Sequence, residues 1–262
     1  MAQFSVSRQA HFHKDNNDIH EVVMLADKDG NILNTSGAAS NIPIAGGLVD
    51  GYGHINKFGA TDGDVTGGTI WDGNSAAVAY PYPSNSVVAV ASTANSGANV
   101  YIEGLDASYN AQSETVAIGS SGTKVFSRIF RAYMVDTNND ADVTLSLSSV
   151  VAAKIIEDLG QTLMAVYTVP AGKTAYLMKL QMGSDKASTN SAMQYSVMAK
   201  EITDGGIFRI KGRFYAAGGQ NIVTEYPVPL KFNEKTDIRI DVTAAQQSSV
   251  SATFDIILVD NA

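Results

Sequence analysis

The sequence predicts an all-β protein made of antiparallel β-sandwich or jelly-roll domains, with an extended N-terminal arm. Three observations support this fold class. Apolar and polar residues alternate with period two in many short stretches. Turn-forming residues separate these stretches at spacings of about 8–12 residues, which is typical of β-sandwiches. Charged residues make up only 17% of the chain while glycine occurs 23 times, a composition with many turns and few salt-bridged helices.

The first 65 residues differ in kind from the rest of the chain. They combine the polar stretch 13–18 with one compact apolar run at 22–25, followed by a hairpin-like turn at 27–31. A segment with so few large apolar groups cannot bury enough surface to offset its ordering entropy. We therefore predict that residues 1–65 form an arm that docks on another chain or on the body of the protein.

A second, smaller β domain is predicted over residues 66–158. The glycine-rich stretch 58–73 is interpreted as a long loop that leads to the single tryptophan, Trp71. Residues 152–159 fit either a strand or a short helix. The predicted strands are 87–91, 100–105, 114–118, 124–135 and 143–150.

Residues 159–262 are predicted to form a larger, jelly-roll-like β-sandwich. In the stretch 208–214, alternation places Phe208, Ile210 and Phe214 on one face and the basic residues on the other. The turn at 170–172, with its proline and glycine, is predicted to connect two strands as a hairpin. Further strands are predicted within 176–182, 237–242 and 250–256.

Composition excludes several classes of function. The chain contains no cysteine, which removes thiolate nucleophiles, cysteine-based zinc sites and iron–sulfur ligation, and fits folding in a reducing cytosol. A net charge of −8 disfavours binding to nucleic acid, which needs a clustered basic surface. No stretch approaches the ~18 apolar residues of a membrane span, and the N-terminus lacks the apolar core of a signal peptide. We expect neither nucleic-acid nor membrane partners.

Two groups of residues raise the question of a metal ion. The four histidines match no ligand motif of known geometry, so contacts with solvent or a partner are expected for His11, His13, His20 and His54. A ladder of side-chain oxygens resembles part of a calcium loop but lacks its glycine and closing glutamate. A polar turn is the default interpretation of Asp136, Asn138, Asp140 and Asp142, with a calcium ion as the alternative.

Catalytic motifs are absent from the sequence. There is no Gly-x-Ser-x-Gly elbow, and Gly172-Lys173-Thr174 lacks the first glycine of a phosphate-binding loop. A pair of carboxylates, as in glycosidases, would first be sought among Glu103, Asp106 and Glu114, although turn carboxylates of this kind are usually structural. We expect no enzymatic activity, no catalytic residue and no cofactor.

Two surfaces are candidates for binding partner proteins. The basic face of 208–214 is a cationic stripe in an acidic protein, suited either to the acidic residues of a neighbouring subunit or to solvent. It consists of Arg209, Lys211 and Arg213. The second surface belongs to the arm and consists of Phe12, His13, Ile19, His20, Val22, Met24 and Leu25.

Five stretches together span residues 12 to about 174: 12–25, 70–73, 80–83, 100–110 and 161–174. They resemble a family of virion structural proteins of tailed bacteriophages, of the type that infects cyanobacteria and other marine bacteria. The resemblance implies a place in the virion, after assembly in the cytoplasm of the host bacterium, and it implies no activity.

Within that setting, the favoured role is a capsid decoration, or cement, protein that binds and stabilises the major capsid protein. A tail or fibre component that binds a host receptor is the alternative, disfavoured because the sequence has no coiled-coil shaft. A carbohydrate-binding module is the second alternative and would present exposed aromatics, such as Tyr80 with Tyr82 or Phe208 with Phe214. A homotrimer is expected, because closed symmetry satisfies exposed edges and decoration proteins of the kind this chain resembles often occupy threefold positions.

Overall fold

The computed structural model describes residues 43–185, 192–202, 206–217 and 219–261, and the backbone of four strands within residues 1–42. The chain divides into two compact units, Met1–His54 and Ile55–Ala262. In the first unit, β1 (Ala10–Asp15) pairs antiparallel with β2 (Asp18–Val23), and β3 (Leu25–Ala26) pairs antiparallel with β4 (Ile32–Leu33). In the part of the chain that the structure describes, no helix is long and apolar enough to cross a membrane.

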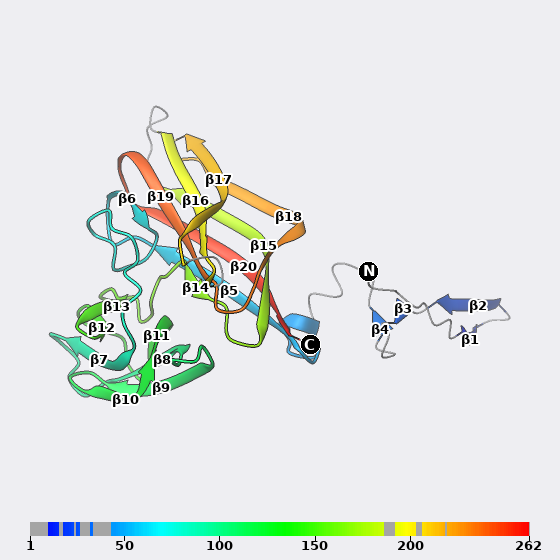
Figure 1. Cartoon of the computed structure of the whole chain (residues 1–262), viewed down its shortest axis with the longest axis horizontal. Helices are drawn as coiled ribbons and strands as arrows, with labels where there is room; N and C mark the ends of the chain where they lie inside the picture. The colour runs from blue at the N-terminus through cyan, green and yellow to red at the C-terminus, as the bar shows by residue number, and fades with distance from the viewer. Residues whose placement is uncertain are drawn as a thin grey trace. The chain divides into compact units, whose positions relative to one another are not determined.

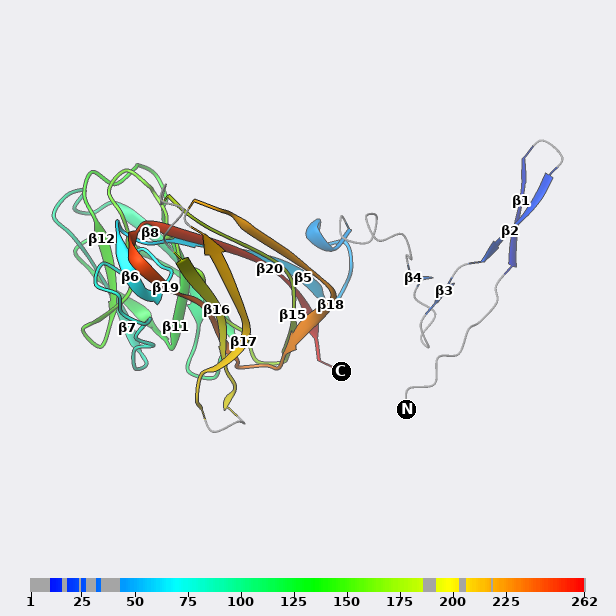
Figure 2. The ribbon, with the colours of Figure 1, turned by 90° about the horizontal axis from the view of Figure 1, so that it is seen from above.

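The second unit confirms the predicted all-β class, with antiparallel sheets throughout (Figure 1). The larger sandwich has one sheet in the order β18-β15-β20-β5 and another in the order β14-β19-β16-β17, in which β19 also pairs with β6. Figure 2 shows β16, β17 and β19 side by side. The bounds are β5 Tyr52–Ala60, β6 Val65–Thr69, β14 Val166–Thr168, β15 Lys173–Ser184, β16 Ala192–Lys200, β17 Arg209–Ala217, β18 Ile222–Phe232, β19 Asp237–Ser248 and β20 Val250–Asp260.

Period-two alternation builds the core of this sandwich. Along β20, every second residue from Val250 to Leu258 is buried, while the residues between them are exposed or half-buried. Phe254 of β20 and three large aromatic side chains from other strands fill the core, and each is at most 2% exposed: Tyr167, Tyr195, Phe232 and Phe254. Burial of this much apolar area is the main source of stability for a sheet pair.

The smaller sandwich pairs the sheet β10-β7-β12-β13 with the sheet β11-β8-β9 around a second hydrophobic cluster. Of residues 152–159, for which the sequence left strand or helix open, 152–155 belong to strand β13 and 156–159 lie in no strand or helix. The predicted strand 143–150 is wrong in its end, because β12 ends at Leu147 and Val150 begins β13. The predicted strand 124–135 is interrupted at Ser127, whose hydroxyl donates to the carbonyl of Asp106 at 2.6 Å. The bounds are β7 Ser86–Ser92, β8 Asn99–Leu105, β9 Ala111–Ala117, β10 Ser121–Phe126, β11 Arg128–Met134, β12 Val143–Leu147 and β13 Val150–Ile155.

The glycine-rich stretch 58–73 is not the long loop that the sequence predicted. It contains the end of β5 and all of β6, which pairs with β19. Glycine is required here because Gly68 has a φ of +93°, and a Cβ at this position would lie 2.3 Å from the carbonyl oxygen of Val78. Close backbone approach, rather than flexibility, accounts for Gly59 and Gly68.

The turn at 170–172 is not a hairpin connection. It joins β14, which pairs with β19, to β15, which pairs with β18 and β20, so the chain changes sheets at this turn. Backbone hydrogen bonds hold the crossing, since Val169 donates to Thr236 at 3.0 Å and accepts from Lys235 at 2.8 Å. Proline and glycine thus predict the turn correctly but do not predict which strands pair.

The predicted domain boundaries at residues 65 and 158 stay predictions. Two strands at the first boundary pair with the C-terminal part of the chain, since β5 pairs with β20 and β6 pairs with β19. Residues 55–65, assigned by sequence to the arm, therefore lie in the second compact unit. Most of residues 1–42 fall outside the described part of the chain.

Replacing Gly59 with alanine is expected to lower the free energy of unfolding by about 1–3 kcal/mol, the usual cost of overpacking. A Cβ there would lie 2.2 Å from the backbone nitrogen of Ala165 and 2.7 Å from the carbonyl oxygen of Ile70. Chemical denaturation measures the change. Gly67→Ala is the matched control, since its Cβ meets only a carbonyl oxygen of Val242 at 3.3 Å. Equal effects of the two substitutions would contradict the packing argument.

Candidate functional site

A buried ionic cluster connects the two sandwiches through the carboxylate of Asp237, which is 1% exposed at the start of β19. Arg128 of β11 binds it in a fork, with Nε 2.8 Å from one oxygen and Nη2 3.0 Å from the other. Lys200 adds an ion pair at 2.8 Å, and the hydroxyl of Thr168 donates at 2.6 Å. Burial alone would raise the pKa of Asp237, but the hydrogen bonds and charges of these partners hold it below its ordinary value.

Two aromatic rings cover the cations of this cluster. The Tyr82 ring lies 4.7 Å from Lys200 Nζ and 5.1 Å from the Arg128 guanidinium, and Phe208 lies 4.0 Å from the guanidinium of Arg239. The two ring centroids are 5.2 Å apart. Tyr82 has a φ of +47°, a strained conformation that these surrounding contacts hold in place. The cluster therefore joins the sandwiches by charge, hydrogen bonds and ring contacts.

The four aromatic residues considered for a carbohydrate-binding surface do not form an exposed row. Tyr80 is 2% exposed, and its hydroxyl donates to the carbonyl of Ala152 at 2.8 Å. The rings of Tyr82 and Phe208 are occupied by cations, and Phe214 packs against the core of the larger sandwich. These four rings do not form a flat stacking surface.

Burial shifts the pKa values of two charged side chains, Lys57 and Asp72, in the direction that favours their neutral forms. Burial, and then the charge of Arg131, lowers the pKa of Lys57 to about 7, while its Nζ donates to the carbonyl of Phe130. Burial raises the pKa of Asp72 well above its usual range, and one of its oxygens accepts from the Leu163 backbone at 2.7 Å. Such groups often mark functional sites. Here Lys57 is 7% and Asp72 0% exposed, so neither is presented to a substrate.

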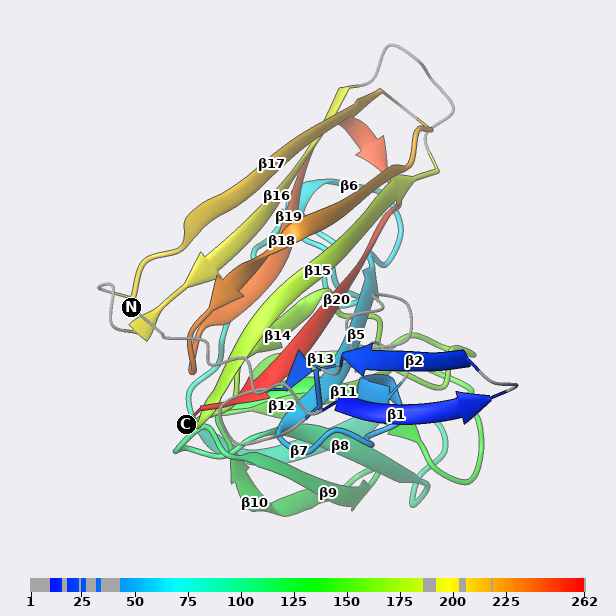
Figure 3. The same cartoon turned by 90° about the vertical axis from the view of Figure 1, so that its right-hand side faces the viewer.

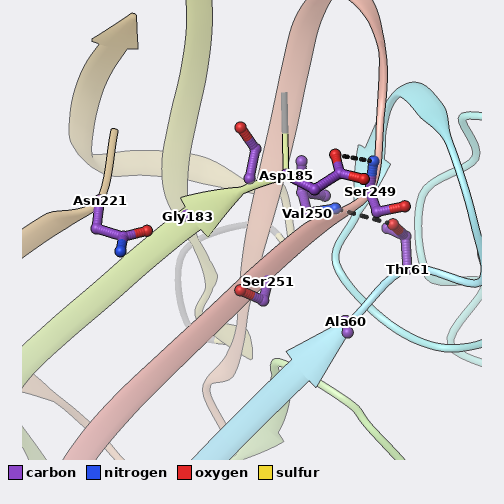
Figure 4. Close-up of a pocket in the computed structure, with 9 residues that line it drawn as sticks. Ala60, Thr61, Gly183, Asp185, Asn221, Ser249, Val250 and Ser251 are labelled. Carbon is purple, nitrogen blue, oxygen red and sulfur yellow. Dashed lines mark hydrogen bonds between the residues drawn. The ribbon is translucent and has the colours of Figure 1, made fainter. Parts of the chain in front are cut away.

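A shallow polar pocket of about 240 Å³ lies beside the ends of β5, β15 and β20 (Figure 4). Asp185 accepts from the Ser249 backbone at 3.0 Å, and the Thr61 hydroxyl accepts from the Val250 backbone at 3.2 Å. The pocket therefore offers hydroxyl and carboxylate groups already engaged in structural bonds. No group of three or more potential metal-ligating side chains occurs among the residues that the structure describes.

Each of the three candidate catalytic carboxylates interacts with other groups of the protein. Asp106 accepts from the backbone of Ser108 and of Asn110, and the bonds from Asn110 lower its pKa. Burial alone would raise the pKa of Glu114, but bonds from Thr123 and Lys124 hold it below its usual value. Glu103 faces Arg131 at 3.8 Å. A general acid needs a raised pKa, and these bonds favour the ionised form of Asp106 and Glu114 instead.

Two of the four side chains considered for a calcium ion, Asp140 and Asp142, use their oxygens in bonds within the protein. Asp142 pairs with Lys154 at 2.8 Å, and Asp140 accepts from Asn95 at 2.8 Å. Asn138 donates to the carbonyl of Asp158 at 2.9 Å. This geometry supports the polar-turn interpretation of residues 136–142.

The residues of the predicted cationic stripe lie on β17, an edge strand of its sheet, but the prediction that they share one face is wrong. Arg213 pairs with Ser196 and Arg209 with Ala199, which lie on opposite faces of β16. Arg209, Lys211 and Arg213 are exposed, and Lys211 pairs with Glu201 at 3.3 Å. The predicted role of these residues in binding a partner stays a prediction.

A β-bulge changes the faces of β17. Met198 of β16 pairs with Ile210, and the register shifts at Lys211. Opposed residues share a face, so the shift turns Ile210 to the side opposite Phe214. Ile210 is 47% exposed, so the prediction that it shares one buried face with Phe208 and Phe214 is wrong.

Most of the arm residues predicted to bind a partner lie on described backbone. Phe12 and His13 are in β1, Ile19, His20 and Val22 are in β2, and Leu25 is in β3. Met24 and all of these side chains lie outside the described part of the structure. Their predicted role in docking stays a prediction.

No protein family model matches the chain, and no curated protein matches it. Weak structural similarity is found to structures of infectious bursal disease virus. The "Structure of infectious bursal disease virus Gt strain" has 12% identity and a TM-score of 0.23, with 68% of this chain aligned to 55% of the viral chain, about half its length. The "Crystal structure of infectious bursal disease virus VP2 subviral particle" has 10% identity and a TM-score of 0.22, with 81% of this chain aligned to 73% of the other.

Proposed function

We propose that this chain is a non-enzymatic structural protein of a phage virion, where it decorates and stabilises the shell by binding the major capsid protein. The observation that carries the proposal is that the protein encloses its charges and exposes large apolar side chains. The buried charges bond to one another across the two sandwiches, and large apolar side chains are exposed on strand edges, such as Tyr215 at 68% and Val228 at 81%. Enclosed charges with outward apolar residues suit a rigid binding surface better than a catalytic cleft.

The place in a virion is supported by the stretches of sequence within residues 12–174 that resemble phage virion proteins. The shell is favoured over the tail because the described chain consists of compact sandwiches rather than a long shaft. A homotrimer suits this role, since symmetric assembly places several copies of one surface on a symmetric shell.

Binding to undecorated capsids of the parent phage tests the proposal. Purified chain is expected to sediment with the capsids at saturating, lattice-matched stoichiometry and to raise their melting temperature, because a ligand that binds only the assembled shell stabilises it. A triple variant with Phe12, Ile19 and Val22 changed to aspartate tests the arm and is expected to bind at least tenfold more weakly. Capsids that neither bind the wild-type chain nor gain stability would contradict the decoration role.

A further inference from the structure

Strand β17 has an unpaired edge with a distinctive pattern of side chains. It ends the sheet order β14-β19-β16-β17, and among the described strands it pairs only with β16 (Figure 3). Because of the bulge at Lys211, Ile210 and Arg213 come two pairing steps apart rather than three. The outer face of β17 therefore presents Ile210, Arg213 and Tyr215 at alternate positions, with the apolar pair 47% and 68% exposed.

The basic charge of this edge determines which strands can pair with it. β17 carries three basic residues and no acid, in a chain with a net charge of −8. Bulges and basic residues normally protect edge strands from aggregation. The basic residues repel a second basic strand, but they attract a strand that carries a carboxylate at the matching position.

The chain itself contains such a strand. β2 has the sequence DIHEVV, with two acids and no lysine or arginine, and within the described strands it pairs only with β1. Ile19, Glu21 and Val23 follow one another at alternate positions, so an acid stands between two apolar residues. This order mirrors Ile210, Arg213 and Tyr215.

We propose that β2 of one copy of this chain pairs with the free edge of β17 in a second copy, with Glu21 opposite Arg213. The pairing adds the β1-β2 hairpin to the sheet of the neighbour and extends it by main-chain hydrogen bonds. With the β3–β4 pair and β5 kept intact, residues 34–51 would span at most about 60 Å if extended, a length of chain that allows the hairpin to reach an adjacent copy. This inference rests on the self-association that is part of the proposed function, and it identifies the two strands that make the contact.

A disulfide test measures this contact directly, because the chain has no cysteine of its own. One chain carrying Glu21→Cys and another carrying Arg213→Cys, with different tags, are mixed and oxidised. Opposed residues in an antiparallel pair have Cβ atoms close enough for a disulfide. We expect a disulfide-linked heterodimer. Lys231→Cys on β18, an edge strand of the other sheet of this sandwich, is the matched control and is expected to give at least tenfold less product with Glu21→Cys.

A chain that carries both Glu21→Cys and Arg213→Cys distinguishes pairing between copies from pairing within one. Disulfide-linked oligomers at micromolar concentration are expected, and an internally linked monomer as the main product would overturn the second copy as the occupant. Equal crosslinking to the β18 control would overturn the choice of β17.

Charge exchange provides an independent measurement. Arg213→Glu and Glu21→Arg are each expected to weaken self-association at least tenfold in sedimentation velocity at low salt, and the double exchange is expected to restore it. Failure of restoration would overturn the pairing of these two residues. Capsid binding is measured separately: if it persists while self-association is unaffected by either exchange, only this inference fails. If self-association behaves as expected but capsids are not bound, only the decoration role fails.

Discussion

Asp237→Asn is expected to lower the free energy of unfolding by about 3–5 kcal/mol, the cost of leaving buried charges without their partner. Asp237 neutralises Arg128 and Lys200, whose side chains are only 11% and 20% exposed. Asparagine keeps the shape but removes the charge, so both cations stay buried beside a neutral amide. For a unit of this size the loss corresponds to a fall in melting temperature of roughly 10 °C.

Glu225→Gln is the control for this substitution. Glu225 also pairs with a cation, Lys179, at 3.3 Å, but the two side chains are 72% and 40% exposed, so water replaces the lost interaction. We expect a loss of at most about 1 kcal/mol in chemical denaturation. A loss at Asp237 no larger than that at Glu225 would show that the cluster does not hold the two sandwiches together.

The free energy of unfolding is expected to rise with pH between about 7 and 10.5 because of Lys57. Its pKa is lowered from 10.5 to about 7 in the folded protein, so between these pH values the unfolded chain binds a proton that the folded protein does not. Proton binding favours the unfolded chain, and this preference weakens as pH rises. The slope is at most about 1.4 kcal/mol per pH unit, or nearly 3 kcal/mol between pH 7.5 and 9.5. Below pH 7 both states are protonated, and the contribution is constant.

Lys57→Met isolates this effect when the two proteins are denatured in parallel at each pH. Methionine fills the buried position without a charge, so we expect the variant to be the more stable at pH 7.5 and its advantage to shrink toward pH 9.5. The other titrating groups are present in both proteins, but the charge of Lys57 lowers the pKa of Asp72, so that pKa is expected to be higher in the variant. A difference that does not change with pH would contradict the lowered pKa of Lys57.

Local patterns predicted much of the fold. The alternation in β20 and the turn residues between strands are local properties of the chain, and they correctly indicated an all-β protein with sandwich packing. Pairing partners are not local. The turn at 170–172 was identified, but its two strands belong to different sheets because β14 pairs with β19 and β15 with β20. The bulge at Lys211 likewise depends on the register with β16.

The ionic cluster was missed for the same reason. Arg128 and Asp237 are 109 residues apart in the chain, and neither belongs to a motif with a defined spacing. A signal for this pair would need information on which positions meet in space. By contrast, the exposed cations of β17 were visible in the sequence, because a run of alternating basic residues is itself a local pattern.

Cryo-electron microscopy of the parent phage particle tests the central claim most directly. The proposed decoration role predicts density for a two-sandwich protein at symmetric positions on the capsid shell, with the N-terminal segment in contact with the major capsid protein or a neighbouring copy. Density confined to the tail would contradict decoration and support a receptor-binding role. Absence of the chain from the particle would contradict its assignment as a virion structural protein.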